Sequence, residues 1–221
     1  MRLKSIGRIV NFALRPAGLE IRKRHDVRPW TIHHNVPSLP ASFFVECRVL
    51  ANRLDLLDII PKTGVVAEIG VSDGDFSAEI IARTQPAILH LIDAWDSDRF
   101  AAGLARVHSR FHTDISCGSV VVHQGLSVDV LPTLAAKSFD WMYIDTTHAY
   151  VETIQELHLC AGLVKDGGRI AGHDFCIGDP YSARPYGVIR AVYEFCLASG
   201  WAFEFITLDG NGYFSFCLKH H

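Results

Sequence analysis

Two carboxylates and two imidazoles follow two strand-like runs of this 221-residue sequence. Asp145 ends the run FDWMYID and His148 comes three residues later, while His173 and Asp174 end the next such run, RIAGHD. In an open parallel sheet, groups at the carboxyl ends of neighbouring strands meet at one edge. Oxygen and nitrogen donors of this kind suit Mg²⁺ or another divalent ion that also holds a substrate. The alternative is that Asp145 caps the next helix and His148 lies on its surface.

A second set of candidates lies in the stretch VVAEIGVSDGDFS, residues 65–77, whose pattern predicts a buried strand, a tight loop and a helix. The small residues Gly70, Ser72 and Gly74 let the backbone turn with positive φ and approach a ligand closely. The following helix offers unpaired N–H groups. Glu68 is a carboxylate in a buried strand, which is costly unless it is satisfied. We therefore expect Glu68 to accept hydrogen bonds from the loop or to face a cationic ligand.

Asp93 ends the apolar run ILHLID, about 20 residues after the glycine-rich loop. An acid in this position can accept hydrogen bonds from both ribose hydroxyls of a nucleotide, although an ordinary helix cap would also use an aspartate here. A nicotinamide-dependent oxidoreductase would share this acid. It would also need the loop G-x-G-x-x-G, which is absent, so that function is disfavoured.

Strand and helix patterns alternate from Val65 onward, which is typical of a parallel sheet covered on both faces. The expected strands are 65–69, 88–93, 119–123, 139–145, 169–173, 201–208 and 213–218. The expected helices are 41–57, 76–84, 98–113, 127–136, 150–164 and 186–199. Asp209-Gly210-Asn211-Gly212 joins the last two strands, and this hairpin signal makes the last strand antiparallel.

The loop Glu68-x-Gly70-x-Ser72-x-Gly74 resembles motif I of the class I S-adenosylmethionine-dependent methyltransferases, which runs acid-x-Gly-x-Gly-x-Gly. Ser72 departs from that motif at its middle glycine. An acid two residues before the first glycine also suits a ligand with an amino group or positive charge better than a pyrophosphate.

The segment from Phe139 to Phe175 resembles the family-24 type of these enzymes, whose motif runs FD-x-x-apolar-I-D-G-x-H-x-Y, then a helix, then GG-x-I-x-x-H-D. The likeness extends over about residues 62–218. Two departures affect the metal site. Thr146 replaces the usual glycine, and His173 stands where some members carry an acid.

This resemblance implies an α/β fold with a Rossmann-like doubly wound sheet, strand order 3-2-1-4-5-7-6 and an antiparallel last strand. It implies O-methylation of a hydroxyl on a sugar or natural-product-like small molecule, assisted by a divalent ion such as Mg²⁺. The implied cofactor-binding residues are Glu68, Gly70, Ser72, Gly74, Asp93, Ala94 and Ser127. The implied metal ligands are Asp145, His173 and Asp174, and the catalytic residues are His148, as base, and Asp145. Ser127 would also serve as an ordinary helix cap.

The alternative function is a non-catalytic protein that binds S-adenosylmethionine in a regulatory or assembly role. In that case the pocket would bind the cofactor, while replacement of Asp145 or His148 would change nothing measurable.

The first 60 residues are predicted to form a basic helical extension, and residues 61–221 the methyltransferase domain. Eight Lys or Arg face two acids in the first 28 residues, whereas the whole chain has a net charge of -3, which disfavours a nucleic-acid partner. Apolar residues at helical spacing in 1–24 predict an amphipathic helix. It would lie on an anionic membrane, or pack on its own domain or on a second copy in a homo-oligomer.

Six scattered cysteines without a C-x-x-C pair are typical of reduced thiols in a cytosolic protein. The sequence contains no apolar stretch near the roughly 20 residues that span a bilayer. We predict a cytoplasmic protein, peripheral to a membrane if the N-terminal helix lies on one.

Overall fold

The computed structural model describes residues 36–96, 100–179 and 184–220. The chain divides into two units, Met1–Thr31 and Ile32–His221, and the description below concerns the second. The predicted helix within 1–24 lies outside the described residues, so its suggested contacts with a membrane or a second copy stay predictions. The boundary predicted between residues 60 and 61 also stays a prediction.

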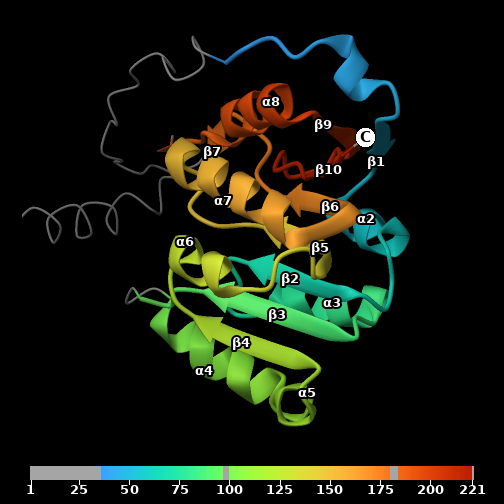
Figure 1. Cartoon of the computed structure of the whole chain (residues 1–221). Helices are drawn as coiled ribbons and strands as arrows, with labels where there is room; N and C mark the ends of the chain where they lie inside the picture. The colour runs from blue at the N-terminus through green and yellow to red at the C-terminus, as the bar shows by residue number, and fades with distance from the viewer. Residues whose placement is uncertain (1–35, 97–99, 180–183, 221) are drawn as a thin grey trace, which may run out of the picture. The chain divides into compact units, whose positions relative to one another are not determined.

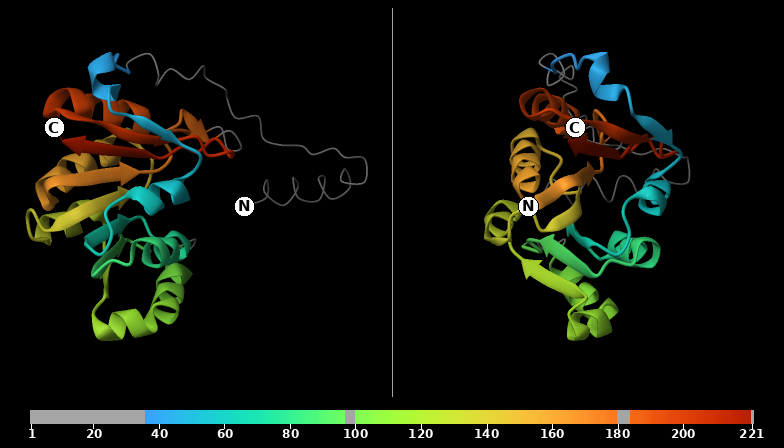
Figure 2. Two further views of the ribbon diagram at one scale, coloured as in Figure 1. Left: turned by 90° about the vertical axis from the view of Figure 1, so that its right-hand side faces the viewer. Right: turned by 45° about the vertical axis from the view of Figure 1, so that its right-hand side comes forward.

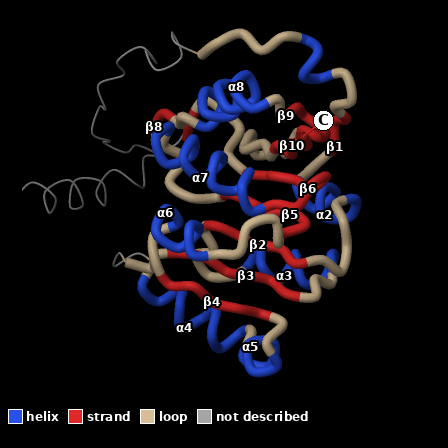
Figure 3. Tube along the Cα trace, viewed as in Figure 1, coloured by secondary structure: helices blue, strands red, loops and turns tan. Residues whose placement is uncertain are grey.

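An eight-stranded sheet lies at the centre of the second unit (Figures 1 and 3). Its strands are β1 (Arg48–Leu50), β2 (Val65–Ile69), β3 (Ile88–Asp93), β4 (Val120–Gln124), β5 (Phe139–Ile144), β6 (Val164–Gly172), β9 (Trp201–Thr207) and β10 (Phe216–His220). Their spatial order is β1-β9-β10-β6-β5-β2-β3-β4, and β10 is antiparallel to both β6 and β9. Apart from the added β1, this is the predicted order 3-2-1-4-5-7-6, so the Rossmann-like fold is confirmed. The strands β7 (Gly178–Asp179) and β8 (Arg184–Pro185) form a separate ribbon.

The single helix expected over 41–57 is wrong. This stretch contains a short 3₁₀ helix (Ala41–Phe44), strand β1 and helix α2 (Arg53–Ile59). Strand β1 pairs in parallel with β9, and this long-range pairing overrides the helical spacing of the apolar residues. Helix α2 begins after Asn52, whose side chain accepts hydrogen bonds from two backbone N–H groups of its first turn.

Helices cover both faces of the sheet. They are α3 (Asp75–Thr84), α4 (Ala101–Arg110), α5 (His112–Cys117), α6 (Ser127–Val130), α7 (Tyr150–Leu163) and α8 (Val188–Ser199). Side chains of α2, α3 and α4 share one buried cluster with one face, and those of α7 and α8 share another with the opposite face. The right-hand view of Figure 2 shows α2 and α3 on the opposite side of the sheet from α6 and α7. The sheet is therefore doubly wound.

The carboxyl ends of β2 and β5 lie against each other. The N–H of Asp145 donates to the carbonyl of Ile69 at 2.7 Å. Gly70 has φ +91°, and a Cβ there would lie 2.0 Å from the carbonyl oxygen of Asp145. Only glycine permits this approach, so the first glycine of the loop brings the loop and the acid at the end of β5 together.

All six cysteines are free, and Cys160, Cys196 and Cys217 are buried. Cys117 is exposed, so burial does not extend to every thiol. Within the described ranges, no helix has the length and apolar character needed to cross a bilayer.

Two histidines on neighbouring strands form a stacked pair away from the strand-end acids. Nδ1 of His90 lies 2.9 Å from Nε2 of His123, and the ring centroids are 5.1 Å apart. Burial, with a smaller contribution from the charge of His123, lowers the pKa of His90 to about 4. Burial also lowers the pKa of His123. The His90 ring is therefore neutral in the folded protein near pH 6.

This pair should make stability sensitive to acid. An unfolded histidine has a pKa near 6.5, so below that pH the unfolded chain binds more protons than the folded chain, and stability falls as pH drops from about 6.5 through 4. His90→Gln should reduce this loss, measured by urea unfolding at pH 7 and pH 5. His108→Gln, on an exposed position of α4, is the control. An equal loss in all three proteins would contradict the prediction.

Candidate active site

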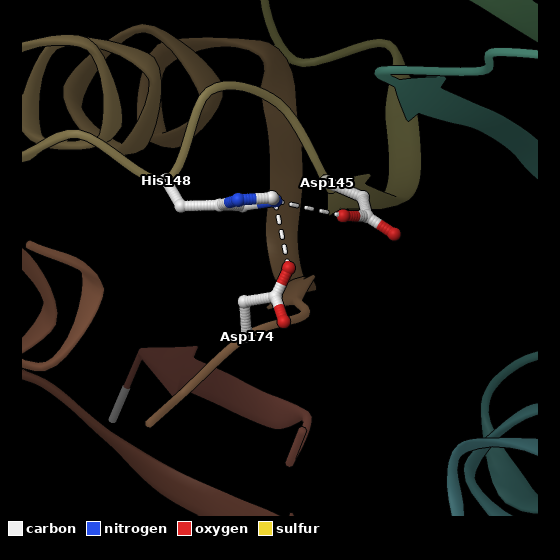
Figure 4. Close-up of side chains that lie close together, drawn as sticks. All are labelled: Asp145, His148 and Asp174. Atoms are coloured by element: carbon white, nitrogen blue, oxygen red, sulfur yellow. Dashed lines mark hydrogen bonds and ion pairs between the residues drawn. The ribbon is translucent and has the colours of Figure 1, made fainter. Parts of the chain in front are cut away.

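The side chains of Asp145, His148 and Asp174 meet at the carboxyl ends of β5 and β6 (Figure 4). Asp145 follows β5, Asp174 lies just after β6, and His148 lies in the loop before α7. Nε2 of His148 is 2.7 Å from Oδ2 of Asp174 and 3.3 Å from Oδ1 of Asp145. One donor atom from each residue lies within 4.8 Å of the others.

His173 borders the same cluster. Its Nδ1 lies 3.5 Å from Oδ2 of Asp174 and 3.7 Å from Oδ2 of Asp145. The structure therefore brings together all four residues singled out at these strand ends. The particular roles, with His148 as base and His173 as a metal ligand, stay predictions.

The two carboxylates control the charge of His148. Burial alone would lower the pKa of His148, but hydrogen bonds to Asp145 and Asp174 and their negative charges raise it to about 9. Burial alone would raise the pKa of Asp174, but its hydrogen bonds with His148 and His173 and their positive charges hold it well below its usual range. Without a cation at the carboxylates, His148 is thus an imidazolium at neutral pH.

The backbone holds this cluster in unusual conformations. His148 has φ +60° and Asp174 has φ +55°, both in the left-handed region. The carbonyl of His148 accepts a hydrogen bond of 2.7 Å from the N–H of Gly187, and the Tyr186 ring lies 4.6 Å from the imidazole, centroid to centroid. Such conformations gather at functional sites, where surrounding contacts over-determine them.

These residues fit a divalent cation. Two carboxylates and an imidazole supply oxygen and nitrogen donors, and the side chain of Asp174 is only 7% exposed. Asp145 and Asp174 belong to both the predicted ligand set and the cluster that the geometry defines. A cation bound there would offset the negative charge of the two carboxylates, which keeps His148 protonated.

Asp93 lies beside the glycine-rich loop, but its carboxylate already holds that loop in place. Its Oδ2 accepts hydrogen bonds from the N–H groups of Val71 and Ser72, each at 2.8 Å. Its Oδ1 accepts another from Trp95 at 2.9 Å. A carboxylate has about four acceptor sites, so about one remains for a ribose hydroxyl. Ala94, between Asp93 and Trp95, is partly exposed.

Glu68 carries a buried acceptor without a partner. It is 1% exposed, and its Oε2 accepts a hydrogen bond from the hydroxyl of Ser77. Oε1 has no hydrogen-bond donor among residues 36–96, 100–179 and 184–220. Burial raises the pKa of Glu68 to about 8, although the Ser77 hydrogen bond opposes the rise. This orphaned acceptor fits a cationic group such as the ammonium or sulfonium of S-adenosylmethionine.

Ser127 belongs to a partly buried hydrogen-bond network around Glu156, a residue that the sequence did not single out. Its hydroxyl donates to Oε1 of Glu156 at 2.6 Å, and the hydroxyl of Thr146 donates to Oε2 at 2.8 Å. Glu156 is 1% exposed, which raises its pKa in spite of both bonds. The hydroxyl proton of Ser127 is used in its hydrogen bond to Glu156. Toward a ligand, the Ser127 oxygen can therefore only accept a hydrogen bond, for example from an adenine amino group. The signal in the sequence is an acid on the apolar face of α7.

Glu68 should make cofactor binding depend on pH. A cationic ligand requires the carboxylate, so affinity should rise as pH increases toward about 8, and binding at pH 7 should release protons. Calorimetry in buffers of different ionisation enthalpy measures that release. In Glu68→Gln the protein should release no proton from this position, so that any proton release that remains comes from the ligand itself. Equal proton release by both proteins would overturn the prediction.

The fold, the glycine-rich loop and the strand-end acids together define a class of protein. Residues 67–175 match the model of a family described as methyltransferase domain, family 24. The chain thus has the fold of the class I methyltransferases, the enzymes that use S-adenosylmethionine, and residues 67–175 match the sequence pattern of their family. No curated protein matches the sequence.

Three solved structures illustrate the likeness. An O-methyltransferase family protein from Burkholderia thailandensis has 14% identity and a TM-score of 0.58, with 76% of this chain and 55% of that chain covered. SMU.1697c from Streptococcus mutans, solved in complex with SAH, has 10% identity and a TM-score of 0.55, with 76% and 94% covered. The B. subtilis m1A22 tRNA methyltransferase TrmK has 12% identity and a TM-score of 0.56, with 78% and 67% covered.

Identities this low show a shared fold and no more. The chain spans about half the length of the Burkholderia protein, and 51% of another match, the pyocyanin biosynthetic protein PhzM. A tRNA methyltransferase is among the proteins that share this fold, so the fold alone is compatible with a small molecule or a nucleic acid as the methyl acceptor.

Proposed function

We propose that this protein is an S-adenosylmethionine-dependent O-methyltransferase that acts on a hydroxyl of a sugar or natural-product-like small molecule, with the help of a divalent cation such as Mg²⁺. The observation that carries the proposal is the cluster of Asp145, His148 and Asp174 beside the glycine-rich loop. Its two carboxylates supply oxygen donors for a cation, and its imidazole lies beside them at the same strand edge. The net charge of -3 supports a small acceptor over a nucleic acid.

Each part of the site has a role in this proposal. Glu68 faces the methionine end of the cofactor, the loop of Gly70, Ser72 and Gly74 lies beneath it, and the remaining predicted contacts are Asp93, Ala94 and Ser127. Asp145 and Asp174, with His173, hold the cation. When bound, the cation lowers the pKa of an acceptor hydroxyl and offsets the charge of the two carboxylates.

His148 then accepts the proton of that hydroxyl, and the oxygen attacks the sulfonium methyl group in line. The bond from the methyl carbon to sulfur breaks as the new carbon–oxygen bond forms, and S-adenosylhomocysteine leaves. Alignment of the two reactants by the protein supplies much of the rate enhancement. The imidazole suits this task because its pKa, once the carboxylates are neutralised, returns toward its usual range near neutrality.

The first test is calorimetric titration with S-adenosylhomocysteine, with Mg²⁺ and with EDTA, using NAD as a control. Micromolar binding of S-adenosylhomocysteine and none of NAD is expected, followed by methyl transfer to vicinal diols in an acceptor screen. Failure to bind S-adenosylhomocysteine in either condition would overturn the proposal. Binding of S-adenosylhomocysteine that Asp145→Asn leaves unchanged, together with no methyl transfer to any acceptor, would favour the non-catalytic alternative.

A further inference from the structure

Arg53, the first residue of α2, reaches the edge of the sheet where the cofactor is expected. Its guanidinium lies 4.4 Å from the centroid of the Phe76 ring, at the start of α3. Its NH1 is 3.5 Å from Oδ2 of Asp145, and the guanidinium also interacts with the hydroxyl of Tyr143. The side chain is 32% exposed, so it lies partly in solvent and partly in the site.

Helix α2 holds Arg53 in this position. Leu56 and Leu57 on the same helix are fully buried against the sheet. Asn52 caps the helix just before Arg53, and the backbone N–H of Arg53 donates to Oδ1 of Asp209 at 3.1 Å. The guanidinium is thus presented by an anchored element and not by a free loop.

Arg53 and Glu68 can provide opposite charges at one end of the glycine-rich loop, because a cationic ligand would displace the proton of Glu68. Arg53 lies over Phe76, and Glu68 bonds to the next residue, Ser77, so both contact the first turn of α3. Burial raises the pKa of Glu68, and the positive charge of Arg53 opposes part of that rise. Two other arginines near the loop, Arg106 and Arg110, already pair with Asp73 and Asp75.

We propose that Arg53 binds the carboxylate of the methionine moiety of S-adenosylmethionine, while Glu68 binds its cationic side. The proposal rests on the proposed function and adds a residue outside the matched stretch 67–175. A guanidinium has five N–H donors, and its ion pair with Asp145 is long, so donors remain for a second carboxylate. The opposite charges of Arg53 and Glu68 match the two charges of an amino acid, and this fixes the orientation of the cofactor.

A ligand that lacks only the carboxylate tests this assignment. Binding of S-adenosylmethionine and of decarboxylated S-adenosylmethionine is measured by calorimetry for the unaltered protein and for Arg53→Gln. We expect Arg53→Gln to weaken S-adenosylmethionine about 10- to 100-fold, the range for a hydrogen bond between charged groups, and to leave the decarboxylated ligand unchanged. Arg53→Lys should retain part of the preference, because the charge remains.

Arg48→Gln is the matched control. The guanidinium of Arg48 also lies over a phenylalanine ring, that of Phe205, at 5.5 Å from its centroid. Arg48→Gln should change the affinity for neither S-adenosylmethionine nor its decarboxylated form. Equal weakening of both ligands by Arg53→Gln would make Arg53 a structural residue and overturn the assignment, and so would no effect on either. If the unaltered protein binds neither ligand, the proposed function itself fails. The thermal unfolding midpoint of each variant shows whether it is folded.

Discussion

His148→Asn is expected to lower turnover by about 10²- to 10⁴-fold, the usual contribution of a general base. Affinity for S-adenosylhomocysteine should stay within about threefold, because the imidazole contacts Asp145, Asp174 and Tyr186 and none of the loop residues. Asparagine is the right replacement, since His148 has φ +60° and asparagine tolerates that conformation better than alanine. The measurement is the rate of methyl transfer to an acceptor found by the screen, beside calorimetry.

His112→Asn, at an exposed position of α5, is the control and should keep full activity. If His148→Asn kept the original rate, His148 would not be the base. If it lost cofactor affinity as much as turnover, the residue would serve binding and not proton transfer.

Gly70→Ala should give the largest loss of stability, about 2–5 kcal/mol, from a strained backbone and an overpacked contact. One part of the cost is the left-handed backbone, which costs a residue with a Cβ about 1–2 kcal/mol. The larger part is steric, because the new methyl group would lie 2.0 Å from the main-chain oxygen of Asp145. Neither strand end can move without breaking the hydrogen bond between Asp145 and Ile69. Urea unfolding measures the change.

Gly118→Ala separates the two parts of that cost. Gly118 has φ +82°, close to the φ of Gly70, but a Cβ there meets nothing within 4 Å. Gly118→Ala should therefore lower the free energy of unfolding by only about 1–2 kcal/mol. Equal losses in the two variants would show that the contact with Asp145 yields easily, and that the loop is less tightly fixed to β5 than the structure indicates.

Most of the sheet could be predicted because its strands carry local signals. The strands β2, β3 and β5 are short apolar runs that end at an acid or a glycine, and each can be recognised without knowing its partner. Strand β1 could not, because Arg48–Leu50 sits among apolar residues at helical spacing. Its pairing with β9 depends on a segment far along the chain, and no local pattern encodes that contact.

The site divides in the same way. Asp145, His148, His173 and Asp174 could be identified because each lies at or just after the end of a strand, and parallel strands align their ends. Glu156 and Arg53 could not, because their partners depend on how helices α7 and α2 pack. Asp93 shows a further limit. Its position was predicted, but the sequence does not reveal that its carboxylate is largely occupied by the N–H groups of the loop.

The place of β10 in the sheet has a consequence for the order of folding. This strand follows all others in the sequence, yet it lies between β6 and β9. On the ribosome, β1 and β9 therefore cannot join the rest of the sheet until β10 has been synthesised, and both β6 and β9 keep an unpaired edge until then. Such edges are prone to pair with other chains. Chains that lack β10 are therefore expected to aggregate more readily than chains in which the sheet is complete.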